Sequence, residues 1–190
     1  MNRTAVKVIL AAVALVLVGG IAWLVATRGT RGGLGGVIEQ LTGAPAGTEK
    51  VMVLLYFAGP GGYLVPERRE LNVTADPKDR IRKIVGAVLD GPRQRDLGRS
   101  FPKGVELGSV LLAANGTVYV DLRSETMTEP PSAGSLEEMQ RVFSVVDSIT
   151  GNVEQAQRVA LLWNGIQRES FGGHLDASRP FVADRSLIAQ

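Results

Sequence analysis

An uncharged, apolar segment near the N-terminus constrains this chain more than any other feature. It covers residues 8–26, and Arg3 and Lys7 precede it. A helix needs about 20 consecutive apolar residues to cross a bilayer. The segment therefore predicts a transmembrane anchor over residues 8–26, preceded by a short N-terminus of residues 1–7.

A cleaved secretory signal is the alternative to an anchor. Its apolar core is shorter, about 7–15 residues, and small residues precede the cleavage site. Here Leu24 would occupy the third position before a cleavage after Ala26, where leucine fits poorly. The chain has no cysteine that could accept a lipid. We therefore favour the uncleaved anchor.

The positive charges that flank this segment indicate its orientation. Arg3, Lys7 and the terminal amine lie before it, whereas Arg28 and Arg31 follow it. The bias is slight, and it favours an N-terminus in the cytoplasm. We expect a single-pass protein of the cytoplasmic (inner) membrane with an extracytoplasmic C-terminal domain. The absence of cysteine selects no compartment.

The rest of the chain divides into a linker and one domain. Residues 27–48 contain seven glycines, which is typical of a flexible linker. From residue 49 to 190 the composition is that of a globular protein, and this length suits one domain with its own core.

The first half of the domain predicts two strands and a helix. Residues 51–57 form an apolar, β-prone run, and residues 63–73 read as extended, with Pro66 typical of an edge or a bulge. Asp76 can cap a helix that begins at the next residue, and Gly91 followed by proline ends it.

The second half predicts a hairpin, a helix and a last strand. Asn115 and Gly116 favour a tight turn between strands at residues 107–113 and 117–122. Ser135 and Glu138 have the spacing of a capping box for the second helix. Alternating apolar residues at 159–163 predict the last strand.

The expected order is β-β-α-β-β-α-β. Two amphipathic helices need an apolar sheet face to cover. We therefore expect an α+β domain, a two-layer sandwich of one mainly antiparallel sheet with both helices on one face.

Six short segments, in order, give the domain a family resemblance. Together they resemble the GerMN domain, the sporulation and spore-germination module of GerM. The match extends from about Val51 to Asp184, in one copy where GerM carries two. The segments are residues 55–57 with 63–67, 88–92, 101–105, 115–122, 143–150, and 161–165 with 171–176.

The resemblance implies a non-enzymatic module for binding or assembly outside the cytoplasm. Related domains are linked to cell-envelope complexes at the membrane and near peptidoglycan, and their fold is similar to the ring-building modules of secretion systems. The resemblance thus implies an envelope protein or peptidoglycan as partner, and no cofactor.

An enzymatic function finds little support in the residues. The chain has one histidine, His174, and no cysteine, which excludes a cysteine nucleophile and thiolate metal sites. A serine triad would need His174, and no nucleophile elbow is present. Paired carboxylates for hydrolysis stay possible, with Glu67, Glu70 and Asp121 as candidates, although solvated positions on strand faces fit them better.

A glycine-rich segment around the histidine is a candidate contact site. Gly172 and Gly173 could expose His174 and Asp176 together, for a small ligand or a cation. The simpler interpretation is a tight turn with His174 bonded to the backbone.

Charge is segregated along the sequence, although the net charge is only +2. Residues 78–103 hold eight basic and three acidic side chains, whereas residues 121–154 hold two basic and seven acidic ones. The first stretch predicts a basic surface for anionic lipid, an acidic wall polymer or an acidic protein. The candidate surface consists of Arg80, Arg82, Lys83, Arg93, Arg95, Arg99 and Lys103.

Other interpretations of this charge pattern stay open. Basic and acidic faces could pair head to tail in a homo-oligomer, or the charges could simply be solvated. Nucleic acid is not an expected partner, because the basic stretch has one aromatic residue, Phe101, and no binding motif.

The sequence thus favours a membrane-anchored, non-enzymatic envelope protein that localises or assembles a complex. The alternative is a sensor for a small molecule or glycan, and a weaker alternative is a peptidoglycan hydrolase.

Overall fold

The computed structural model describes residues 47–189, which fall within one compact unit. In this part of the chain no helix has the length and apolar character that crossing a membrane requires. The expected N-terminus of residues 1–7, the anchor of residues 8–26 and the linker as far as residue 46 lie outside the described residues.

The described domain has the predicted order of elements, with one short strand added at the end. The elements are β1 (Glu49–Ala58), the 3-10 turn η1 (Pro60–Gly62), β2 (Leu64–Val73), α3 (Pro77–Asp90), β3 (Glu106–Leu112), β4 (Thr117–Arg123), α4 (Ser135–Thr150), β5 (Arg158–Trp163), β6 (Ile166–Gln167) and the 3-10 turn η2 (Arg185–Leu187).

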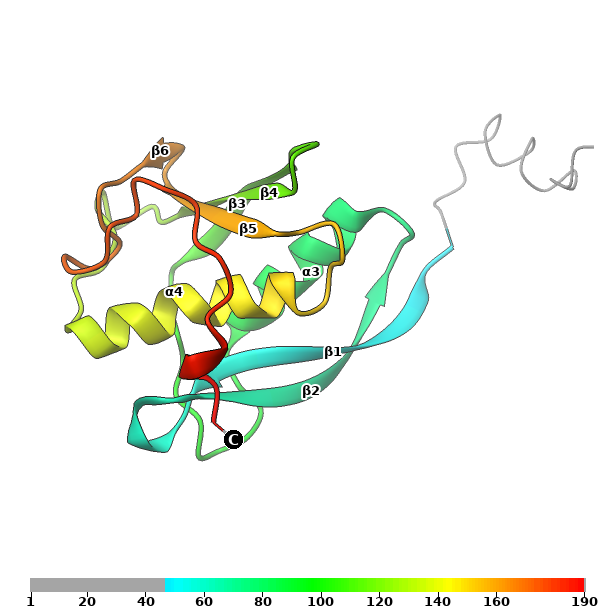
Figure 1. Cartoon of the computed structure of the whole chain (residues 1–190), viewed down its shortest axis with the longest axis horizontal. Helices are drawn as coiled ribbons and strands as arrows, with labels where there is room; N and C mark the ends of the chain where they lie inside the picture. Colours follow the sequence, from blue (N-terminus) through cyan, green and yellow to red (C-terminus); the bar gives the residue numbers. More distant parts are fainter. Residues whose placement is uncertain (1–46, 190) are drawn as a thin grey trace, which may run out of the picture. The chain divides into compact units, whose positions relative to one another are not determined.

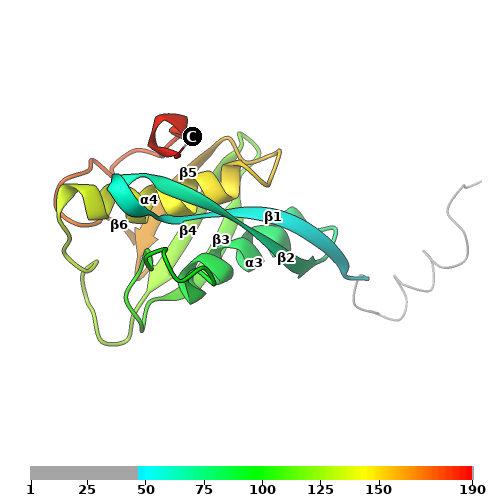
Figure 2. The same ribbon diagram turned by 90° about the horizontal axis from the view of Figure 1, so that it is seen from below.

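The strands form two sheets, so the prediction of a single sheet was wrong. Strands β1 and β2 make a separate antiparallel hairpin, and the other four pair in the order β3-β4-β5-β6. Both helices lie between the two sheets (Figures 1 and 2). Only β4 and β5 pair in parallel, so the fold is mainly antiparallel, as expected.

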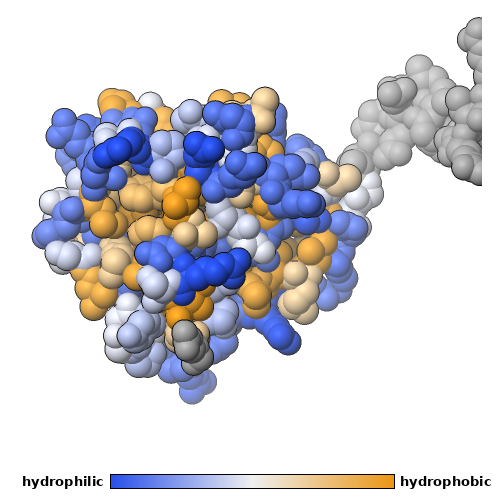
Figure 3. All heavy atoms as spheres, in the orientation of Figure 1, coloured by the Kyte–Doolittle hydropathy of each residue, from blue (hydrophilic) through white to orange (hydrophobic). Residues whose placement is uncertain are grey.

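One core joins all the elements. The inward residues of β1 pack against the helices from one side, and those of β4 and β5 pack from the other. Phe57, Ile84, Val146, Val120 and Trp163 are all fully buried. Burying a large apolar side chain of this kind contributes about 1.5–3 kcal/mol. On the surface, hydrophobic residues are scattered among hydrophilic ones on the face seen in Figure 3.

Helix α3 begins and ends as the sequence predicts. The Asp76 side chain accepts a hydrogen bond from the backbone N–H of Lys78, and Gly91 ends the helix with a φ of 88°. The Arg99 guanidinium donates to the carbonyls of Leu89 and Asp90, at 2.6 and 2.5 Å. These bonds satisfy carbonyls at the C-terminus of the helix, so Arg99 stabilises it.

The two Asn-Gly pairs form different turns. At the β3–β4 turn only Gly116 has a positive φ, 76°, so Asn115 does not adopt the left-handed conformation that a type I′ turn requires. After β5, Asn164 and Gly165 both have positive φ, 51° and 79°. This second turn adds β6, which the prediction missed although its Asn-Gly signal was present.

The C-terminal segment, residues 179–189, lies across the domain. Phe181 exchanges two backbone hydrogen bonds with Val159, at 2.8 and 2.7 Å. The Phe181 ring also packs edge-on against Phe143 of α4. Further along, the N–H of Ala189 donates to the carbonyl of Leu64 at 2.8 Å. The segment therefore connects the four-stranded sheet to the β1–β2 hairpin.

Candidate functional site

Glu138, at the start of α4, is completely buried. Its Oε1 accepts hydrogen bonds from the Ser170 hydroxyl at 2.8 Å and the Phe171 N–H at 3.0 Å. Its Oε2 accepts from the backbone N–H of His174 at 2.6 Å. The carboxylate thus organises the loop of residues 170–175.

This arrangement corrects the expected capping box. Helix α4 has Gly134 as its N-cap, and no side chain caps it. The glutamate of a capping box would accept a hydrogen bond from the N-cap backbone N–H of its own helix. Glu138 instead lies on the inward face of α4, where the loop of residues 170–175 offers it several donors.

The loop keeps Glu138 ionised. Burial by itself would raise the pKa of this carboxyl, but hydrogen bonds from Ser170, His174, Leu175 and Phe171 outweigh burial and hold its pKa below the usual value. The buried negative charge is thus balanced by local dipoles.

The candidate residues of the glycine-rich segment belong to this loop. Gly172 lies so close to Glu138 that an added Cβ would come within 3.0 Å of its side chain, and Gly173 has a φ of 111°. His174 Nδ1 lies 3.3 Å from Glu138 Oε2. The His174 side chain is 46% exposed. The structure therefore brings His174 to Glu138.

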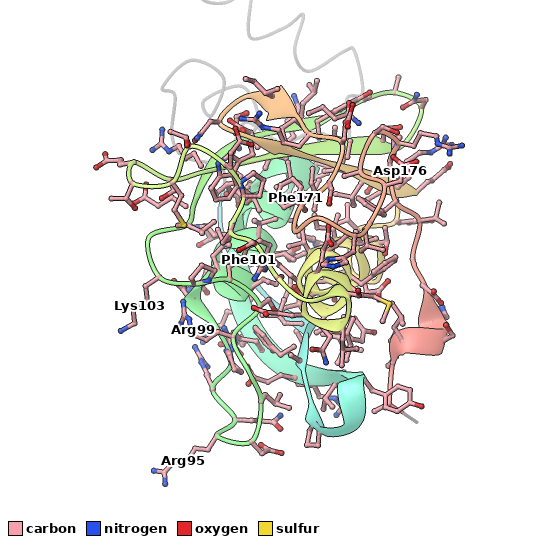
Figure 4. All side chains as sticks on the ribbon, turned by 90° about the vertical axis from the view of Figure 1, so that its left-hand side faces the viewer. Arg95, Arg99, Phe101, Lys103, Phe171 and Asp176 are labelled. Carbon is pink, nitrogen blue, oxygen red and sulfur yellow. The ribbon has the colours of Figure 1, made fainter. Side chains whose placement is uncertain are left out.

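Asp176 has different partners. It accepts hydrogen bonds from the Ser178 hydroxyl at 2.5 Å, from the Ser178 N–H at 2.9 Å and from the Arg179 guanidinium at 3.3 Å. These bonds hold the pKa of Asp176 below its usual value. No hydrogen bond joins Asp176 to His174 within residues 47–189. Asp176 thus closes a local turn at the domain surface (Figure 4).

The candidate hydrolytic carboxylates do not converge. Glu67 is 3% exposed, so the expectation that it is solvated was wrong. It pairs with the buried Arg69 and accepts from the N–H groups of Arg93 and Gln94, at 2.7 and 2.9 Å. Burial raises the pKa of Glu67, but these hydrogen bonds outweigh burial and lower it. The loop after α3 covers this face of β2, which the alternating pattern did not reveal.

The other two carboxylates point elsewhere. Glu70 is three residues from Glu67, hence on the opposite face of β2, and pairs with Lys50 at 2.8 Å on the surface. Asp121 lies in the other sheet, where it accepts from the N–H of Gly165 at 2.7 Å. Within residues 47–189, no group of three His, Asp or Glu side chains could hold a metal ion.

The basic residues fall into two groups along the domain. Arg80, on α3, forms an ion pair with Glu49 at 3.2 Å, where β1 begins. The backbone N–H of Gly98, in the loop after α3, donates to the carbonyl of Ala58, where β1 ends. The ten residues of β1 span about 30 Å. We call the group on α3 the proximal group, and it consists of Arg80, Arg82 and Lys83.

The distal group is on the loop that follows α3. Figure 4 shows the side chains of Arg95 and Lys103 extending away from this end of the domain, while Phe101 points inward. Arg99 bonds the end of α3, as described above. The distal group consists of Arg93, Arg95, Arg99 and Lys103.

The acidic stretch contributes less to the surface than its sequence suggests. Glu138 and Asp147 are both buried. Asp147 Oδ1 accepts from the N–H of Asp184 at 3.2 Å, and Oδ2 has no partner among the described residues. The sequence did not single out Asp147, or the buried Arg141 of the same helix, because neither has a local motif.

Comparisons with known proteins identify the family. Residues 54–169 match the family model Germane, described as sporulation and spore germination. This match covers more than half of the chain, so the chain belongs to that family, which is not a known family of enzymes. No curated protein matches the sequence significantly.

Solved structures share the fold. The first GerMN domain of the sporulation protein GerM from Bacillus subtilis matches with a TM-score of 0.54 and 18% identity, over 72% of this chain and 98% of that one. The tandem GerMN domains of GerM match with a TM-score of 0.52 and 18% identity, over 72% of this chain and 46% of that one. A protein from Clostridium perfringens, described as a candidate lipoprotein, matches with a TM-score of 0.51 and 19% identity, over 72% of this chain and 88% of that one.

Proposed function

We propose that this protein is a membrane-anchored envelope protein without enzymatic activity, whose domain localises or assembles a complex outside the cytoplasm. Residues 8–26 anchor the protein in the inner membrane, and its domain binds an envelope protein or peptidoglycan. The relatives are described as a sporulation protein and a candidate lipoprotein, and both descriptions suit a protein of the envelope.

The observation that carries this proposal is the position of the distal group. The loop that carries this group is bonded to Ala58, at the end of β1 that lies about 30 Å from Glu49, where the chain enters the domain. On an anchored domain, this end can reach away from the membrane. The distal group is therefore suited to an acidic partner in the envelope rather than to the lipid surface nearby.

The buried polar groups support a binding role rather than catalysis. Glu67, Arg69 and Glu138 are each engaged in bonds that hold loops to the core. A hydrolase needs two carboxylates at a defined separation around the scissile bond. The three candidate carboxylates lie on different faces and in different sheets, which gives the hydrolase alternative no support.

The test is co-sedimentation of the purified full chain, in mild detergent, with peptidoglycan and with solubilised envelope fractions. A distal variant, with Arg93, Arg95 and Lys103 changed to glutamine, is compared with a proximal variant, with Arg80, Arg82 and Lys83 changed to glutamine. Both variants remove three positive charges, and Arg99 stays because it stabilises α3.

We expect binding that weakens as salt rises, because exposed charges are screened. The distal variant should lose most of this binding and the proximal variant should keep it. Equal losses in the two variants, or binding that ignores salt, would contradict the proposal. Salt-sensitive oligomers of the chain alone would instead support head-to-tail self-association.

A further inference from the structure

A hollow of about 340 Å³ lies beside the distal group, between the loop after α3 and the start of α4. Its lining includes Arg99, Ser100, Pro102, Pro131, Glu137 and Arg141. The volume is at the lower end of the range for ligand sites. It can therefore hold one or two side chains.

The polar side of the hollow centres on a buried arginine. Arg141 is 2% exposed. Its guanidinium donates to the carbonyls of Ser100 and Pro131, at 3.1 and 2.5 Å, and to Glu137 Oε1 at 2.8 Å. A guanidinium has five N–H donors. These three bonds leave two of them unused among the described contacts.

Ser100 provides a second, independent feature. The residue is 4% exposed, and its hydroxyl has no hydrogen-bond partner among residues 47–189. A buried hydroxyl without a partner costs about 1–3 kcal/mol. An acceptor in the hollow would remove this cost. Ser100 and Arg141 both line the hollow, and both have donor groups that no described contact uses.

The charges favour a single negative charge. Arg99 and Arg141 line the hollow against Glu137, which leaves one positive charge. A carboxylate neutralises this charge and matches the planar fork of an arginine. A phosphate dianion would meet greater repulsion from Glu137.

The walls favour a peptide over a sugar. Pro102 and Pro131 provide apolar contacts, whereas Phe101 is 2% exposed and offers no open ring face for a sugar to stack on. We infer that this hollow binds the carboxylate side chain of an acidic segment in a partner protein. The inference deepens the proposed function, because it names the chemistry that the partner presents to the distal end.

The inference is tested by fluorescence anisotropy with a labelled, end-blocked tetraglutamate peptide and the full chain in mild detergent. We expect saturable binding, and no binding of the tetraglutamine peptide. Ser100→Ala should weaken binding about tenfold, because it removes the unpartnered hydroxyl. Glu137→Gln should strengthen binding about threefold to fivefold, because the exposed competitor for Arg141 loses its charge.

Arg95→Gln is the matched control. It removes an exposed charge from the same loop, but Arg95 does not line the hollow, so affinity should change less than twofold. If Arg95→Gln weakens binding as much as Ser100→Ala, and Glu137→Gln has no effect, the attraction is diffuse and the inference is wrong. Circular dichroism checks that each variant is folded.

Two competition experiments distinguish a carboxylate ligand from phosphate and from peptidoglycan. Inorganic phosphate that displaces the peptide at lower concentration than acetate would show a phosphate site and overturn the inference. Soluble peptidoglycan fragments that bind when the peptide does not would also overturn it. Because the peptide assay contains no envelope fraction, its failure leaves the co-sedimentation test of the proposed function intact.

Discussion

Asp147 of α4 accepts a hydrogen bond from the backbone N–H of Asp184, and this bond joins the C-terminal segment to the helix. The carboxyl is 3% exposed. Burial is the main cause that raises its pKa from 3.8 to about 6, and the nearby Asp184 adds to it, while the Asp184 N–H and Arg185 act in the opposite direction.

The raised pKa of Asp147 predicts how the stability of the domain depends on pH. The folded state holds a proton on Asp147 at a pH where the unfolded chain has lost it, so stability falls as pH rises from about 4 to above 6. The cost above this range is roughly 2–3 kcal/mol, from the size of the shift. Urea unfolding at pH 4.5, 6 and 7.5 measures it.

Asp147→Asn is the matching variant, since its amide oxygen can still accept from Asp184. We expect it to be more stable than the unmodified chain at pH 7.5 and similar to it at pH 4.5. Asp184 and Arg185, which also influence the pKa of Asp147, are unchanged in this comparison. Identical pH profiles for the two proteins would disprove the assignment.

Glu138→Gln should loosen the loop of residues 170–175. The neutral amide loses charge-assisted bonds from Phe171 and His174, and we expect a loss of about 3 kcal/mol in the free energy of unfolding. Because the folded pKa of Glu138 is lowered, its contribution is present above pH 4.5 and is lost as pH falls. Hydrogen exchange at the two amides should accelerate. Glu154→Gln is the control, because Glu154 is exposed and forms no ion pair among the described residues, and an equal effect there would contradict the prediction.

Glu67→Ala should be much more costly than Glu70→Ala. Removing Glu67 leaves Arg69 buried without its charge partner, at a cost of about 3–5 kcal/mol. Glu70 pairs with Lys50 on the surface, where such a pair contributes at most about 1 kcal/mol. Chemical denaturation compares the two variants, and similar midpoints would refute the structural role of Glu67.

Two glycines should respond to alanine in opposite directions. At Gly116, with a φ of 76°, an added Cβ would approach Gln157 Cγ to 2.8 Å, so Gly116→Ala should destabilise by about 1–2 kcal/mol. Gly86 lies inside α3 with open space around it, so Gly86→Ala should stabilise by about 0.5–1 kcal/mol. Thermal unfolding measures whether the melting temperature of each variant rises or falls. A shift in the same direction in both variants would contradict this expectation.

Local patterns in the sequence predicted most of the elements. The alternation around Val120 and the helical spacing of Ile84 and Val88 depend on neighbours in the chain, and both segments formed as expected. Strand pairing could not be predicted in the same way. Alternation shows which face of a strand is buried, but not which strand lies beside it, so the sequence does not reveal that the strands form two sheets.

The buried polar residues show more clearly what local sequence patterns cannot predict. Glu138 shares an inward stripe of α4 with Val142, Val145 and Ile149, so its spacing carried a signal of burial that the capping motif obscured. Its partners are more than thirty residues further along the chain, and no local pattern indicates them. Most side chains of the basic stretch are exposed, but its division into two groups depends on how α3 lies along β1.

The bonds of Glu138 also bear on where this domain ends. The family match stops at residue 169, whereas the donors to Glu138 begin at Ser170. A chain shortened to the matched residues would lose the first half of β1, and it would also leave an ionised group in the core without the dipoles that balance it. The segment matched by the family model is therefore shorter than the segment that balances the charge of Glu138 in this chain.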